Sequence, residues 1–200
     1  MPEFEDKVGW ATVEGLMTLQ ERRAVLDASA ELLGLPPEQR WAGDKPNQGT
    51  KHLTNLDERI PVVAEVLTRS SLTDVVADIL GPHFALSQAS YRNPQPGFGG
   101  QKLHADDLHK LDQGPNTVAT ALVSLVDFTP TNGATRIVPG SHRRPDLQRR
   151  AGSLDRHDEE ILLTGSAGTA FVFSGHLLHS GTLNHSSDDR PALQLLWRAR

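Results

Sequence analysis

Apolar residues recur at helical spacing through the first third of the chain. A capping box begins at Thr18, and the apolar stripe that follows it stops at Gly34, next to two prolines. A second helix is expected to start at Pro61, because proline suits the first helical position. The sequence SLTD, residues 71–74, indicates the start of a third helix, which should end at Gly81. The N-terminal part is therefore predicted to be mostly helical.

The rest of the chain alternates between short apolar runs and turn-rich stretches. The apolar or alternating runs indicate strands at 84–91, 117–128, 135–138, 168–175 and 192–199. Pro, Gly, Asn and Asp gather between these runs, as in turns. Many short strands separated by turns predict a sandwich or a barrel. We therefore expect one mainly β domain over 1–200, with residues 1–82 as mostly helical support and residues 83–200 as the β core.

Composition narrows the class of protein. The 200 residues fit one domain, and the sequence has no cysteine, which excludes disulfides, zinc–thiolate sites and thiol catalysis. The net charge of −5 gives no sign of the excess of basic residues that binds nucleic acid or an anionic membrane. The sequence shows no signal-peptide pattern and no apolar run long enough to cross a bilayer. The expectation is a soluble, cytoplasmic protein with neither nucleic-acid nor membrane partners.

The segment LHADD, residues 103–107, contains the first candidate chemistry. Residues two apart in a strand point to the same side, so His104 and Asp106 can face one cavity. A second histidine would complete the 2-His-1-carboxylate facial triad of non-haem Fe(II) oxygenases. Asp107 is an alternative carboxylate, but its parity is wrong for sharing a face with His104. Taken alone, the H-x-D pattern also fits an exposed His–Asp pair.

Two histidines further along the chain compete for the third ligand position. His176 and His179 lie beside Gly175 and Gly181, which allow the backbone to approach another group closely. The two histidines are three residues apart, so in a strand they face opposite ways and only one can join the triad. Arg190 lies eleven residues beyond His179 (190 − 179), enough for a turn and a return on the adjacent strand. Its planar guanidinium is suited to binding both oxygens of a carboxylate.

Three segments resemble a known family. HADD at 104–107, NGATRIVPGSH at 132–142 and HSGTLNHSSDDR at 179–190 occur in this order. Together they closely resemble the phytanoyl-CoA dioxygenase-like (PhyH) branch of Fe(II)/2-oxoglutarate-dependent oxygenases. The opening FEDKVGWATVEGLMTLQERRAVL resembles the start of that family, where a short strand leads into a helix. The likeness extends over about residues 4–198.

The resemblance implies a fold and a ligand set. The fold is a double-stranded β-helix, a cupin-like jelly-roll barrel, with the N-terminal helices packed on one sheet. The metal ligands are His104, Asp106 and His179, which are also the catalytic residues, and Arg190 holds the far carboxylate of 2-oxoglutarate. The pattern H-S-G-x-x-N and the step to Arg190 favour His179 over His176 as the distal histidine.

The resemblance also suggests further positions around the co-substrate. Family members line its pocket from the central strand, from the strand before H-x-D and from a basic residue upstream. The corresponding candidates here are Thr120, Leu122, Gln88, Lys51 and Ser180. The family often has a tryptophan near Leu122, and many members read Gly-Ser after the distal histidine where this chain reads Ser180-Gly181. Lys102 and His109 are candidate contacts of the substrate.

The implied reaction is the oxidation of an unactivated C–H bond by O₂, with conversion of 2-oxoglutarate into succinate and CO₂. Related halogenases have a small residue in place of the aspartate, so Asp106 favours hydroxylation, with desaturation, epoxidation or cyclisation as alternatives. A cupin-type enzyme would show His-x-His with a following Glu, which this sequence lacks. A non-catalytic metal-binding jelly roll is a further alternative. The expected substrate is a small-molecule metabolite, in the manner of secondary metabolism, and the expected protein is a monomer or a homodimer.

Overall fold

The computed structural model describes residues 4–107, 116–148 and 151–200. Its elements in chain order are β1 (Trp10–Val13), α1 (Leu19–Gly34), η1 (Pro37–Gln39), β2 (Thr50–Leu53), α2 (Leu56–Arg59), α3 (Pro61–Leu67), α4 (Ser70–Leu80), β3 (Phe84–Pro94), β4 (Val118–Ser124), β5 (Thr135–Ile137), η3 (Ser141–Arg143), α5 (Pro145–Gln148), β6 (Ile161–Leu162), β7 (Ala170–Ser174), β8 (His179–Gly181) and β9 (Ala192–Ala199). No helix in these ranges combines the length and the apolar character that crossing a bilayer requires. The mainly β prediction is confirmed.

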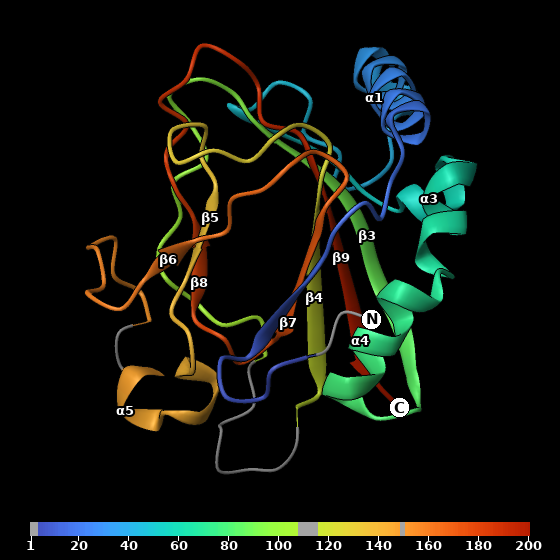
Figure 1. Ribbon diagram of the computed structural model, residues 1–200. Helices are drawn as coiled ribbons and strands as arrows, with labels where there is room; N and C mark the ends of the chain where they lie inside the picture. Colours follow the sequence, from blue (N-terminus) through green and yellow to red (C-terminus); the bar gives the residue numbers. More distant parts are fainter. Residues whose placement is uncertain (1–3, 108–115, 149–150) are drawn as a thin grey trace.

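Two antiparallel sheets form the body of the protein. The larger has the strand order β1-β7-β4-β9-β3-β2, and the smaller has the order β6-β5-β8. Figure 1 shows α1, α3 and α4 on one side of the large sheet and the small sheet on its other side. The large sheet therefore has no solvent-facing side at its centre, which explains why every residue of β4 is buried.

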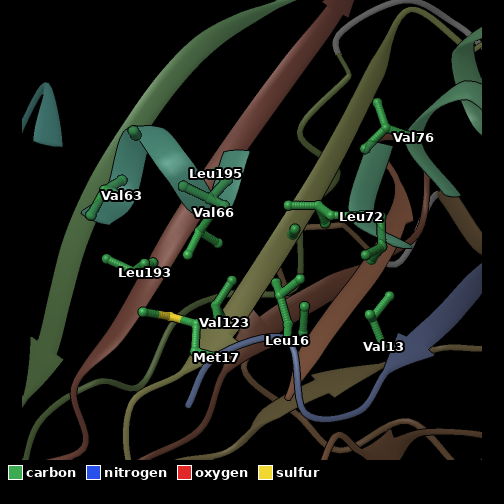
Figure 2. Close-up of a cluster of buried hydrophobic side chains, with 14 of the residues drawn as sticks. Val13, Leu16, Met17, Val63, Val66, Leu72, Val76, Val123, Leu193 and Leu195 are labelled. Carbon is green, nitrogen blue, oxygen red and sulfur yellow. The ribbon is translucent and has the colours of Figure 1, made fainter. Parts of the chain in front are cut away.

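Alternate residues of the central strands pack into two different cores. Residues of α3 and α4, including Val66 and Leu72, pack against Val123 of β4 and Leu195 of β9 (Figure 2). The opposite face of β4 contributes Leu122 to a second core between the two sheets. Period-two alternation thus separates a structural face of the large sheet from an inner face that is available for chemistry.

The three predicted helices are present as α1, α3 and α4, one of them with an earlier start, whereas the short α2 and α5 were not predicted. The Thr18 hydroxyl accepts the backbone N–H of Glu21 at 3.3 Å, and the Glu21 carboxylate accepts the backbone N–H of Thr18 at 2.8 Å. The start predicted at SLTD is wrong by one residue, because α4 begins at Ser70 and its N-cap, Arg69, makes no side-chain cap. The Arg69 guanidinium instead donates to Glu21 and to the carbonyl of Leu16. The position of α4 is therefore set by a tertiary contact.

The strands differ more from the prediction than the helices do. β3 extends to Pro94 because it pairs with β9 along most of its length and with β2 at its end. β4 ends at Ser124, several residues before the predicted end. β1 and β2 lie within the first 82 residues and both belong to the large sheet, so that part of the chain supplies strands as well as helices.

Candidate metal centre and cleft

His104 and His179 are joined through their backbones. The N–H of each residue donates to the C=O of the other, and both N···O distances are 2.9 Å. This isolated bridge places the HADD segment beside β8, and the two imidazole centroids lie 4.4 Å apart. Gly181 lets the segment at Gly99 approach β8 closely, because a Cβ at position 181 would lie 2.5 Å from the carbonyl oxygen of Gly99.

The two imidazoles are oriented by backbone carbonyls. Nδ1 of His104 lies 2.8 Å from the carbonyl oxygen of Lys102, and Nδ1 of His179 lies 2.9 Å from that of Leu177. A carbonyl oxygen only accepts, so each Nδ1 bears a proton, and in the neutral imidazole Nε2 is then the atom with the free lone pair. Metal-binding histidines commonly have this arrangement, in which the outer ring nitrogen donates to a fixed acceptor.

Asp106 completes the cluster. Its Oδ1 lies 3.8 Å from Nε2 of His104, and its Oδ2 lies 3.5 Å from Nε2 of His179. The Thr120 hydroxyl, on the inner face of β4, donates to Oδ2 at 2.7 Å and so fixes the carboxylate. One ligand atom from each of these three residues lies within 4.8 Å of the other two, a spacing from which three donors converge on one ion.

The charge states of the cluster also suit a metal. Burial lowers the pKa of His179, Asp106 opposes this shift, and His104 adds to it. His179 is therefore neutral at pH 7, as a ligand must be. The side chain of His104 is 38% exposed, so the cluster is open to solvent on one side. The donor set of two imidazoles and one carboxylate fits divalent iron better than it fits zinc–thiolate or calcium chemistry.

A cleft between the two sheets leads from the cluster to Arg190. Its lining comprises Arg92, Pro94, Gly99, Gln101, His104, Thr120, Leu122, Thr135, Phe173, His179, Gly181, Arg190, Ala192 and Gln194. Arg190 is buried, its guanidinium carbon lies 4.6 Å from the centre of the Phe128 ring, and its Nε has no hydrogen-bond partner among the described residues. Burial, followed by the charge of Arg92, lowers the pKa of Arg190 to about 10. Arg190 is thus a buried cation whose donor groups are available to a ligand.

The structure brings only part of the predicted co-substrate set to this cleft. Thr120 and Leu122 line it from β4. Gln88 instead donates to the hydroxyl of Ser90, and Lys51 lies 3.7 Å from Asp189. The Ser180 hydroxyl accepts from Arg136 at 2.7 Å. None of these last three predicted residues is among the residues that line the cleft, because each side chain is bound elsewhere.

The alternative ligands, Asp107 and His176, contact each other and other residues, and neither belongs to the cluster of converging ligand atoms. Asp107 accepts the backbone N–H and the hydroxyl of Thr117, and its Oδ2 lies 3.7 Å from Nε2 of His176. Both side chains are buried away from the three converging ligand atoms. Lys102 is exposed and is not among the cleft-lining residues, and His109 lies outside the described residues.

Sequence reasoning missed Arg92 and Gln194. Both lie on the inner face of the large sheet, and Nη1 of Arg92 donates to Oε1 of Gln194 at 3.3 Å. The alternation in SQASYRN contained the signal, since Arg92 shares its parity with Ser90, but the predicted strand stopped at residue 91.

Comparison with known proteins gives the family. The family model described as phytanoyl-CoA dioxygenase (PhyH) matches residues 6–192. The chain belongs to the PhyH family. Among its PhyH-like relatives, dioxygenase cdmA of Talaromyces verruculosus is 30% identical over 158 residues, which are 74% of this chain and 53% of the relative. Ectoine dioxygenase of Sphingopyxis alaskensis is 25% identical, in a match that covers 97% of this chain and 73% of the relative. The chain spans about half the length of the first curated relatives it matches.

Solved structures confirm the jelly-roll prediction. HygX from Streptomyces hygroscopicus, crystallised with nickel and 2-oxoglutarate, superposes with a TM-score of 0.75 at 19% identity, over 97% of this chain and 84% of its own. EctD from S. alaskensis with bound Fe superposes with a TM-score of 0.72 at 23% identity. The superposition covers 97% of this chain and 74% of the EctD chain. The double-stranded β-helix of the PhyH family is therefore the fold of this chain.

Proposed function

We propose that this chain is an Fe(II)- and 2-oxoglutarate-dependent oxygenase that hydroxylates an unactivated C–H bond of a small-molecule metabolite. The observation that supports this most directly is the convergence of His104, Asp106 and His179 at one end of a cleft that also contains the buried Arg190. Membership of the PhyH family agrees with it, as do relatives named Fe(II)/2-oxoglutarate-dependent dioxygenase nvfF and ectoine dioxygenase.

The three ligands would hold the iron facially. Each histidine presents Nε2 because its Nδ1 proton is held by a backbone carbonyl. Asp106 keeps Oδ1 for the metal, because its Oδ2 accepts the Thr120 hydroxyl. When bound, the iron supplies the activation of O₂ that oxidises both 2-oxoglutarate and the substrate. The protein supplies orientation and partial exclusion of water.

Arg190 would hold the far carboxylate of 2-oxoglutarate. The guanidinium offers a planar pair of donors, and its burial makes an unpaired state costly, so a carboxylate is its natural partner. The apolar side chains of Leu122, Phe173 and Ala192 line the cleft beside it. They would keep water from competing for the same donors.

The reaction is tested by product analysis. Purified protein with Fe(II), 2-oxoglutarate and O₂ should form succinate slowly without a substrate and faster with members of a metabolite library. Succinate formation that is unchanged in Asp106→Asn would contradict an iron site at Asp106. A mass gain of one oxygen in the stimulating metabolite distinguishes hydroxylation from desaturation or cyclisation, and NMR of the product separates an alcohol from an epoxide. Metal binding without any 2-oxoglutarate turnover would favour the non-catalytic module.

Four wider features belong to the same proposal. We infer one domain over residues 1–200 that works in the cytoplasm, in keeping with the absence of cysteine. The substrate class is a free small molecule, as for the structural neighbour crystallised with hygromycin B. The working unit is a monomer or a homodimer, which light scattering of the purified protein decides.

A further inference from the structure

The cleft contains a second arginine that the proposed chemistry does not use. Arg92 projects from β3 on the same face as the cleft, and among the described lining residues only Arg92 and Arg190 have permanently charged side chains. Burial lowers the pKa of Arg92, and Asp106 is the opposing charge. Asp106 already accepts the Thr120 hydroxyl and belongs to the metal cluster. Arg92 therefore has no carboxylate of its own among the described residues.

A count of formal charges shows that the positive charge of Arg92 has no counter-charge in the site loaded with iron and 2-oxoglutarate. This count rests on the proposed function. Iron brings two positive charges and Arg190 brings one, while Asp106 brings one negative charge and the 2-oxoglutarate dianion brings two. Histidines that bind a metal are neutral. These charges cancel without Arg92, so its guanidinium leaves one positive charge uncompensated in a partly buried cleft. Such a charge is costly unless an anion pairs with it.

The neutral polar groups of the cleft point to the same conclusion. The oxygen of the Gln194 amide is occupied by Arg92 at 3.3 Å, and that of the Gln101 amide accepts the backbone N–H of Gly181 at 3.2 Å. Guanidinium and backbone N–H groups only donate, so the orientation of each amide is fixed and its NH₂ remains a donor. The described polar lining is therefore rich in donors, and donors select a ligand rich in acceptors.

We propose that the primary substrate is a carboxylic acid and that Arg92 binds its carboxylate. A carboxylate has one negative charge and two acceptor oxygens, which match the surplus charge and the planar fork of the guanidinium. Arg92 is thus a specificity-determining residue, distinct from the co-substrate anchor Arg190. Small acids bind productively, and their neutral amides do not.

The test uses the whole protein loaded with Mn(II) and saturating 2-oxoglutarate. The probes are acetate and acetamide, which have similar size and differ in charge. Paramagnetic relaxation of the probe's methyl protons reports binding near the metal and ignores binding elsewhere. Acetate should be relaxed clearly more than acetamide in the unmodified protein. In Arg92→Gln the acetate affinity should fall roughly tenfold or more, as for the loss of a charge-assisted hydrogen bond. Arg198→Gln, a change of an exposed arginine, is the matched control and should leave acetate binding unchanged.

Calorimetric titration of 2-oxoglutarate into the same samples separates this proposal from the proposed function. If the unmodified protein does not bind 2-oxoglutarate, the proposed function fails. If 2-oxoglutarate binds but acetate and acetamide are relaxed equally, the assignment of Arg92 fails alone. Loss of 2-oxoglutarate binding in Arg92→Gln would make Arg92 a co-substrate anchor and overturn the proposal. If Arg92→Gln does not fold, Arg92→Lys and the comparison of acetate with acetamide on the unmodified protein still decide whether Arg92 binds the carboxylate.

Discussion

The backbones of His104 and His179 exchange two hydrogen bonds of 2.9 Å each, so two proposed metal ligands far apart in the sequence are held as neighbours. The Nδ1 atom of each ring is held by a carbonyl of its own segment, two residues before the histidine. The cluster is thus largely preorganised by main-chain contacts. Single side-chain changes should therefore alter metal binding without dismantling the site.

Adjacent aspartates provide a matched test of the ligand set. Asp106→Asn removes a carboxylate ligand. It should weaken metal binding by more than the ~10–100-fold that is typical when a residue hydrogen-bonded to a metal ligand is lost. Asp107→Asn should leave metal affinity within a few-fold of the unmodified protein. It should instead lower the free energy of unfolding by about 1–3 kcal/mol, because Asp107 accepts two partly buried hydrogen bonds from Thr117. Competition with a metal chelator and urea unfolding measure the two effects, and the reverse pattern would assign the ligand to Asp107.

The Thr120 hydroxyl should matter through Asp106. Thr120→Val removes the 2.7 Å hydrogen bond to Oδ2 at nearly constant volume, so the carboxylate loses its fixed orientation. Metal affinity is expected to fall ~10–100-fold, as for other outer partners of metal ligands. Thr12→Val in β1, outside the cleft, is the control and should bind metal normally. Equal affinities of the two variants would remove Thr120 from the site.

Arg190→Lys tests the co-substrate anchor. Lysine keeps the charge but replaces a planar fork by a point charge, so 2-oxoglutarate binding should weaken by roughly 1–3 kcal/mol. Calorimetric titration in the presence of Zn(II) measures this without turnover. The same change at the exposed Arg198 should have no effect. An unchanged affinity in Arg190→Lys refutes the anchor role.

Acid should weaken the contact between α1 and α4. Arg69 donates to Glu21, which also accepts the N–H of Thr18, and together these lower the pKa of Glu21 from 4.5 to about 2. A lowered folded-state pKa gives stability that is complete above pH 4.5 and is lost as the pH falls towards 2. Glu21→Gln should therefore be less stable than the unmodified protein at pH 7, with a difference that shrinks below pH 4.5.

Urea unfolding at several pH values measures this difference. Glu31→Gln, on an exposed position of the same helix, serves as the control and should show no such pH dependence. A constant difference between Glu21→Gln and the unmodified protein from pH 7 to pH 3 would contradict the linkage to Arg69.

Features set by neighbouring residues could be predicted from the sequence. The capping box at Thr18 and the end of α4 at Gly81, which has a φ of 79°, depend on local backbone chemistry. The structure places Asp107 away from the three converging atoms, but not for the predicted reason: the parity argument at HADD assumed a strand, and the structure has only an isolated bridge at His104 there.

Features set by distant partners could not be predicted. The start of α4 follows from the contact of Arg69 with Glu21, and the full length of β3 follows from its pairing with β2 and β9. The family resemblance suggests Lys51 and Ser180 by position alone, and their side chains contact Asp189 and Arg136 instead. Long polar side chains reach several neighbours, so their direction is decided by tertiary packing.

The most direct test of the central claim is anaerobic spectroscopy of the protein with Fe(II) and 2-oxoglutarate. Chelation of an iron held by His104, Asp106 and His179 should give a weak visible charge-transfer band, because the facial triad leaves adjacent positions open for the co-substrate. In His179→Ala the band should be absent, and iron should no longer bind stoichiometrically. Absence of the band in the unmodified protein, with iron binding unchanged in His179→Ala, would contradict the assignment of this site.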